Sequence, residues 1–368
     1  MLYLHHWSDY MKKSLFKILI CVLILTLLTS CDTSKVLRTK DLSDKLTQTT
    51  VVTKSNILQQ EDYGIFFNNF KNSFTVPGLF EGVIPQGIGY DETNNVFLIT
   101  GYFEDEELPS MIMCVDGTSG ALKSYHTLKN TEGKDFYGHV GGIAVSQNTV
   151  YVVNSGECYT MPLTDTTIGG NAPLQFKGKF KLNTQGSFAC IHNNVLWVGD
   201  FIQSDKEERE KITNLTTLPT GETFYAYCEG YVLQDGLPSV DKINKESNGY
   251  IPDYLIAIPE QVQGLAFTKT DKLIFSTSYG RKNNSALLVF DDILSTEKVG
   301  TKDIDGKAVD LYACSNNMLI STIEAPPMSE GLAETPDGIY LLFESGAAKY
   351  RNGGGKYPVD TVYVTTIE

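Results

Sequence analysis

Short apolar segments, separated by polar turns, repeat along most of the chain. Each repeat contains a glycine or another small residue, an apolar segment, a turn and a second apolar segment. The turns are rich in Asp, Asn, Gly and Pro, which are the residues that tight hairpin turns need. The five copies span residues 85–102, 139–156, 184–201, 262–280 and 328–346. Apolar runs of this length without a helical period predict strands, so we expect each copy to fold as a β-hairpin.

A further apolar segment of strand length follows each hairpin. These third strands are expected at residues 111–117, 158–163, 224–233, 286–292 and 360–367. Stretches such as 121–128 and 253–259 are candidates for a fourth, outer strand. Beyond the N-terminal segment, helical periodicity is confined to the charged stretch 204–212. Three or four strands in each of several similar units predict an all-β fold, a β-propeller.

The number of blades depends on a weaker hairpin pattern at residues 309–323. It begins shortly before the last clear copy, so it is either a truncated blade or the outer half of the preceding one. We expect six blades, with five or seven as alternatives. A β-sandwich would explain the strands but not five similar units in a row.

The N-terminal segment has the pattern of an export signal. Three lysines precede an 11-residue apolar run, Ile18–Leu28, which is too short to span a membrane comfortably. It ends in Leu-Thr-Ser-Cys at residues 28–31 and resembles a bacterial lipobox. The resemblance implies that residues 1–30, with Met11 as the start, form a lipoprotein signal peptide. It also implies lipidation of Cys31, which would hold the protein on the cell membrane, facing away from the cytoplasm. A plain secretory signal with a chance cysteine is the alternative.

Residues 31–60 are polar, contain no glycine after Cys31, and predict a flexible tether, followed by the propeller domain at 61–368. The formal net charge is -14, and no cluster of Lys and Arg is large enough to follow a phosphate backbone, which argues against nucleic acid as a partner. We therefore expect the membrane as a partner through the lipid, and beside it a small molecule, a carbohydrate or an envelope protein.

The cysteines beyond the lipobox do not indicate a disulfide framework. There are five of them, an odd number, and most lie in apolar strand-like segments: Cys114, Cys158, Cys190, Cys228 and Cys314. We expect buried free thiols. No spacing of Cys and His indicates zinc.

The repeating hairpins of residues 80–347 resemble the propellers of SMP-30/gluconolactonase-like, strictosidine-synthase-like and NHL-repeat proteins. Metal-dependent members of these families hold a cation with acidic and amide side chains from several blades. The resemblance implies a divalent cation such as calcium, and a lactonase-like hydrolase or lyase. Glu330 is the one acidic residue at the start of a first strand, so it is the candidate metal ligand.

Hairpin geometry predicts which side chains share a face of the propeller. The start of the first strand and the end of the second lie at the same end of an antiparallel pair. The starts supply Gln86, His139, Ser187, Gln263 and Glu330. The ends supply Tyr102, Asn154, Asp200, Tyr279 and Glu344, with Arg281 close behind. This set predicts a polar channel site for a small or sugar-like ligand. The alternative is an ordinary solvated channel mouth.

Two functions remain open from the sequence. One is a membrane-anchored binding or scaffold propeller, which the lipobox, the tether and the lack of a catalytic motif favour. The other is the metal-dependent hydrolase or lyase that the family resemblance implies. No nucleophile elbow, zinc-protease helix or phosphate-binding loop is present in the sequence, and the catalytic residues of an enzyme of this kind are unknown.

Overall fold

The computed structural model describes residues 46–57, 63–104, 108–167, 170–205, 215–244 and 247–367. The predicted signal peptide, Cys31 and most of the charged stretch 204–212 lie outside these residues. One compact unit extends from Thr47 to Glu368. It is a β-propeller, as the hairpin repeats predict.

Each of five sheets contains a run of four antiparallel strands, from the innermost to the outermost. The first blade consists of β2 (Val83–Asp91), β3 (Val96–Phe103), β4 (Met111–Asp116) and β5 (Leu122–Lys129). The second consists of β6 (Gly142–Ser146), β7 (Thr149–Asn154), β8 (Glu157–Pro162) and β10 (Gly178–Lys181). The third consists of β11 (Phe188–His192), β12 (Val195–Gly199), β15 (Ala226–Gln234) and β19 (Tyr254–Ile258). The fourth consists of β20 (Val262–Phe267), β21 (Leu273–Thr277), β22 (Ser285–Phe290) and β25 (Leu319–Ala325). The fifth consists of β26 (Ser329–Thr335), β27 (Gly338–Phe343), β28 (Thr361–Thr365) and β1 (Phe70–Thr75).

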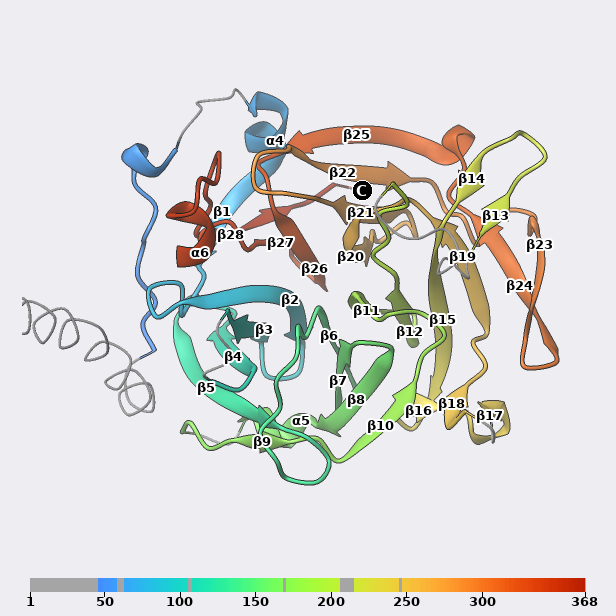
Figure 1. Ribbon diagram of the computed structural model, residues 1–368, viewed down its shortest axis with the longest axis horizontal. Coiled ribbons are helices and arrows are strands. Elements are labelled where there is room, and N and C mark those ends of the chain that lie inside the picture. The colour runs from blue at the N-terminus through green and yellow to red at the C-terminus, as the bar shows by residue number, and fades with distance from the viewer. Residues whose placement is uncertain are drawn as a thin grey trace, which may run out of the picture. The chain divides into compact units, whose positions relative to one another are not determined.

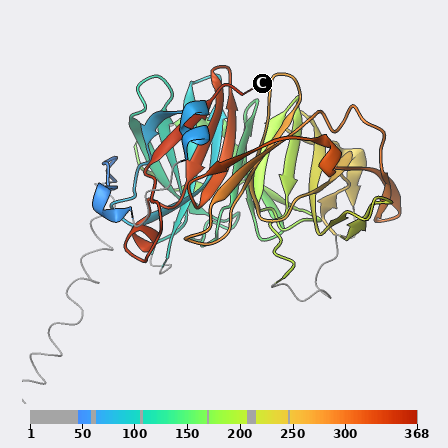
Figure 2. The ribbon, with the colours of Figure 1, turned by 90° about the horizontal axis from the view of Figure 1, so that it is seen from above.

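The inner strands form a closed ring. Each of them packs against the inner strand of the next blade, in the order β2, β6, β11, β20, β26 and back to β2 (Figure 1). In the view turned by 90°, strands lie side by side across the molecule (Figure 2). The described residues therefore form five blades.

The expectation of six blades was wrong, because the segment 309–323 is divided between two sheets. Its first half lies in β24 (Lys307–Ala313), which pairs in parallel with β19 and antiparallel with β23 (Gly300–Ile304) at the edge of the third blade. Its second half lies in β25, the outer strand of the fourth blade. Both blades offer an open outer edge with unpaired backbone groups, and each edge takes one apolar segment.

The two ends of the compact unit close the ring. Strand β1 comes from the N-terminal side and pairs with β28 from the C-terminal side, with Phe70 opposite Thr365. Gln48, in the stretch that the sequence assigns to the tether, adds a second link. Its amide donates to the carbonyls of Thr75 and Gly120, both at 2.6 Å, and accepts from the backbone of Leu122 at 2.7 Å. The chain thereby joins its fifth blade to its first.

Glycines let the inner strands approach one another closely. A Cβ atom on Gly142 would lie 2.3 Å from the backbone nitrogen of Ala189 in the next blade. One on Gly264 would lie 2.8 Å from the carbonyl oxygen of Glu330. Gly87 and Gly331 have equally close backbone neighbours. The glycine that recurs at the start of the hairpins therefore serves packing between blades.

The apolar core lies between the sheets, and all five predicted thiols are free and buried in it: Cys114, Cys158, Cys190, Cys228 and Cys314. The remaining short strands are β9 (Leu174–Gln175), β13 (Thr216–Thr217), β14 (Thr223–Phe224), β16 (Leu237–Pro238), β17 (Ile243–Asn244) and β18 (Gly249–Tyr250). The helices are η2 (Lys54–Asn56), α4 (Gly64–Asn69), α5 (Leu163–Thr167), η4 (Val240–Lys242), η5 (Asn316–Met318) and α6 (Ala348–Arg351). Within the part of the chain that is described, none of the helices has the length and apolarity to cross a membrane.

Candidate functional site: a polar cavity at the channel mouth

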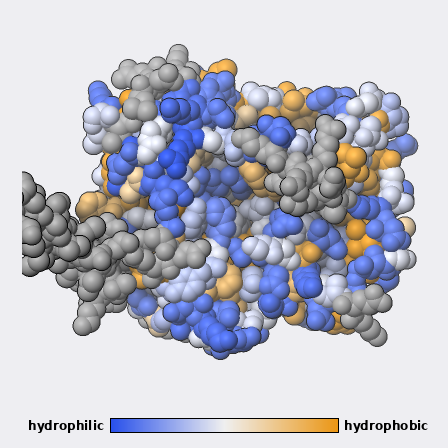
Figure 3. Space-filling view, in the orientation of Figure 1, coloured by the Kyte–Doolittle hydropathy of each residue, from blue (hydrophilic) through white to orange (hydrophobic). Residues whose placement is uncertain are grey.

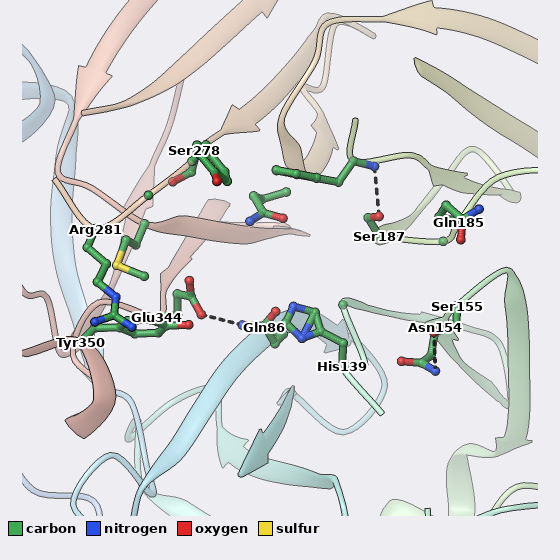
Figure 4. Close-up of a pocket in the computed structure, with 17 residues that line it drawn as sticks. Gln86, His139, Asn154, Ser155, Gln185, Ser187, Ser278, Arg281, Glu344 and Tyr350 are labelled. Atoms are coloured by element: carbon green, nitrogen blue, oxygen red, sulfur yellow. Dashed lines mark hydrogen bonds between the residues drawn. The ribbon is translucent and has the colours of Figure 1, made fainter. Parts of the chain in front are cut away.

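A cavity of about 500 Å³ opens near the starts of the inner strands. Side chains from all five blades line it (Figure 4). Hydrophilic residues gather around the middle of the face on which Figure 1 looks (Figure 3). The volume is within the range of small-molecule sites, which is about 300–1,000 Å³.

Most of the residues predicted for the channel face line this cavity. They are Gln86, His139, Asn154, Ser187, Gln263, Tyr279, Arg281 and Glu344. They come together because the ends of antiparallel hairpins meet at one face in every blade. That they bind a ligand stays a prediction. The other three predicted residues, Tyr102, Asp200 and Glu330, are not part of the cavity lining.

Glu330 and Glu344 form a buried pair of carboxyl groups. They lie on β26 and directly after β27, and their exposed fractions are 2% and 8%. Gln86 Nε2 donates to Glu344 Oε2 at 2.9 Å, and Gln263 Nε2 donates to Glu330 Oε1 at 3.2 Å. The two carboxyl groups also hydrogen bond to each other, which requires that one of them keep a proton. The pair thus connects the fourth, fifth and first blades.

Burial and mutual repulsion set the protonation of this pair. Burial raises the pKa of Glu344 to about 7. Burial, followed by the neighbouring charge of Glu344, raises the pKa of Glu330 well above its usual value. The sequence places Glu330 on the channel face, whereas the structure buries it. The pairing of β26 with β27 shifts between Ser329 and Leu332, which interrupts the regular alternation of side chains at this point.

Tyr350 and Tyr102 extend the network to His139. Tyr350, on α6, hydrogen bonds to both Glu344 and Tyr102. The Tyr102 ring lies 4.7 Å from the His139 ring, and burial raises the pKa of Tyr102 to about 12. Loss of solvent contact, followed by the charge of Lys349, lowers the pKa of His139. His139 is therefore a neutral imidazole at pH 7 and can both donate and accept a hydrogen bond.

Asp200 supports the opposite wall without lining it. It is buried, and its Oδ1 accepts from the backbone nitrogen of Gln185 at 2.6 Å. Ser187 lies two residues further on, where its Oγ accepts from the backbone nitrogen of Phe201 at 3.0 Å. These bonds fix the loop before β11, from which the side chains of Gln185 and Ser187 reach the cavity.

Several lining residues were not predicted from the sequence. They are Gly141, Ser155, Gln185, Gly186, Phe201, Ser278, Gly280, Met328 and Tyr350. Most are neighbours of predicted residues, and a wider window around each hairpin end would have included them. Tyr350 is different, because it comes from a helix in the connection between β27 and β28 that has no counterpart in the repeats.

No group of three or more His, Cys, Asp or Glu side chains within the described residues is arranged to hold a metal ion. Glu330 is engaged with Glu344 and Gln263. The divalent cation at Glu330 stays an expectation from the family resemblance.

No protein-family model matches the sequence, and neither does any curated protein. Solved structures resemble the fold only distantly. Glutaminyl cyclase from Myxococcus xanthus has a TM-score of 0.41 at 9% identity, over 81% of this chain and 97% of that one. The PQQ-bound aldose sugar dehydrogenase from Streptomyces coelicolor has a TM-score of 0.41 at 14% identity, over 80% and 96%. BamB from Moraxella catarrhalis has a TM-score of 0.36 at 12% identity, over 87% and 100%. Likenesses this weak carry no argument about chemistry.

Proposed function

We propose that this protein is a lipid-anchored binding propeller of the cell surface, whose central cavity takes a small polyhydroxylated ligand. One observation carries the proposal: amide, hydroxyl, carboxyl, imidazole and guanidinium groups from all five blades face a single cavity of about 500 Å³. In a concave site, a small number of convergent polar groups is enough to fix the orientation of a small ligand.

The chemistry of the wall favours a carbohydrate-like ligand over an apolar one. Gln185 and Gln263 present amides, which can donate and accept at the same time and so match hydroxyl groups. Phe201 and Tyr279 add an aromatic surface, with ring centroids 6.3 Å apart. A sugar ring offers the same combination of apolar faces and polar edges.

The lipid anchor at Cys31 rests on the lipobox, and it lies outside the described residues. It would keep the propeller at the membrane while the tether leaves the channel face accessible. A chain with a formal net charge of -14 is not attracted electrostatically to anionic lipid headgroups, so the acyl chains would supply the attachment to the membrane.

Isothermal titration calorimetry with a panel of neutral hexoses tests the binding function. A matched pair of variants locates the site. Gln185→Trp fills the cavity from an exposed wall position, and Gln234→Trp places the same side chain at an exposed position outside the lining. Binding should be lost in Gln185→Trp and kept in Gln234→Trp. Equal binding by both variants would place the ligand elsewhere.

The metal-dependent hydrolase is the alternative, and it requires a cation at Glu330. Metal analysis of the purified protein, with melting curves before and after a chelator, separates the two functions. Stoichiometric calcium and a lower melting temperature after chelation would favour the hydrolase. Metal-free protein that still binds sugar would favour the binding propeller.

A further inference from the structure

Arg281 is held against the cavity wall by three contacts. Its Nη1 donates to the carbonyl oxygen of Gly353 at 3.0 Å. Its guanidinium carbon lies 5.2 Å from the centroid of the Tyr350 ring. Its own carbonyl oxygen accepts from the backbone nitrogen of Lys356 at 3.1 Å. The fork of this arginine is therefore oriented before any ligand arrives, which lowers the entropic cost of binding.

The glycine below the guanidinium allows this arrangement. A Cβ atom on Gly353 would lie 2.7 Å from Arg281 Nη1, so a larger residue would push the guanidinium away. The Arg281 side chain lies beside Tyr350 at the edge of the cavity (Figure 4).

Arg281 lines the cavity and is exposed, and most of its hydrogen-bond donors are not used by the described residues. Among the ion pairs of the described residues, it takes part in none. The nearby Lys349, in contrast, lies 3.3 Å from a carboxylate oxygen of Glu104. A guanidinium has five donors, and only the bond to Gly353 is made within the described part of the chain.

The carboxyl groups of the cavity are already supplied with donors. Glu344 accepts from Gln86 and Tyr350 and hydrogen bonds to Glu330, which accepts from Gln263. His139 is neutral, as derived above. Among the residues that line the cavity, Arg281 therefore carries a positive charge that is not paired with a carboxylate.

We propose that the ligand of the cavity is a sugar that carries a carboxylate, a uronic acid, and that Arg281 binds this carboxylate. The inference rests on the proposed binding function and adds the ligand class. Guanidinium and carboxylate match in a two-pronged, charge-assisted pair, which is stronger than a bond between neutral groups. The hydroxyl groups of the same sugar bond to the amides of Gln185 and Gln263.

Calorimetry with D-glucuronate, D-glucose and D-glucosamine, at one pH and ionic strength, tests the ligand class. Glucuronate carries a carboxylate where glucose has its C6 hydroxymethyl group. Glucosamine carries an ammonium group in place of the C2 hydroxyl of glucose. Glucuronate should bind most tightly, and Arg281→Gln should weaken it by at least about tenfold while glucose changes little. Lys282→Gln removes the same charge from the neighbouring exposed residue, which does not line the cavity, and should leave glucuronate binding unchanged.

Each other outcome overturns a defined part of the proposal. Equal binding of glucose and glucuronate, or preference for glucosamine, would contradict the carboxylate and leave the binding function standing. Equal losses in the two variants would show general electrostatics and contradict a role of Arg281. If none of the three sugars binds at millimolar concentration, both the ligand class and the proposed function fail. A diglucuronide in the same assay distinguishes a free sugar acid from the end of a polysaccharide.

Discussion

At the scale of single residues, the carboxyl pair makes the stability of the propeller depend on pH. Burial raises the pKa of Glu344 from 4.5 to about 7, so between these values the folded state keeps a proton that the unfolded state releases. The contribution of protonated Glu344 to the stability of the fold is therefore complete below pH 4.5 and is lost as the pH rises through 7.

Glu344→Gln keeps the shape of the side chain but cannot ionise. As the pH rises from 4.5 to 8, we expect the free energy of unfolding of this variant to increase relative to that of the wild type by roughly 1–3 kcal/mol. Urea unfolding at a series of pH values measures this difference. Glu92→Gln, at an exposed turn, is the control and should change by less than about 0.5 kcal/mol at any pH. If the stabilities of the wild type and of Glu344→Gln change with pH in parallel, the buried pair is not the source of the pH dependence.

The three histidines of the described residues should titrate differently. Burial, opposed by bonds to Glu334 and Asp271 at 2.9 and 2.7 Å, leaves the pKa of His192 raised above 6.5. Burial lowers the pKa of His126 and of His139 below 6.5. Protonated His192 therefore stabilises the fold below pH 6.5, and this contribution is lost as the pH rises through its folded pKa. An NMR titration measures all three, and a value for His192 below that of His139 would contradict the account.

Individual residues show how far sequence reasoning reached. The face shared by Gln86, Gln263 and Glu344 was predictable, because antiparallel pairing fixes it within each hairpin. The burial of Glu330 was not, because it depends on a shifted strand register and on a second carboxyl group from another strand. Tyr350 gave no signal, since α6 occurs in one blade only.

At the scale of elements, the inner strands depend on glycine. We expect Gly142→Ala to destabilise the propeller by about 1–3 kcal/mol, because the new methyl group would lie 2.3 Å from a backbone atom of the next blade. Gly300→Ala is the matched control: nothing lies within 4 Å of a Cβ atom at this edge-strand position. Chemical denaturation compares the two. Equal effects would mean that the glycines do not set the spacing of the blades.

The blade count was harder to predict than the strands. Apolar patterning located the inner hairpin and the third strand of each blade, because these are local features. It could not tell which sheet takes an outer strand. β24 and β25 are neighbours in sequence but join different blades, and β1 reaches the fifth blade from the other end of the chain.

At the scale of the whole molecule, the anchor and the site are separate predictions. Cys31→Ser should remove the lipid and shift the protein from the membrane fraction to the soluble fraction, or leave it as an uncleaved precursor. Each acyl methylene contributes about 0.8 kcal/mol to membrane attachment, and the mutant has none to contribute. Fractionation with mass spectrometry of the N-terminus measures this. A mature, acylated Cys31→Ser protein in the membrane would contradict the lipobox.

The central claim is that five blades converge on one ligand site at the channel mouth. A crystal structure of the protein soaked with D-glucuronate tests it most directly. The account predicts density for the sugar in the cavity, with its carboxylate on Arg281 and its hydroxyl groups on Gln185 and Gln263. An empty cavity, with the sugar bound at an outer loop or at no ordered position, would contradict it.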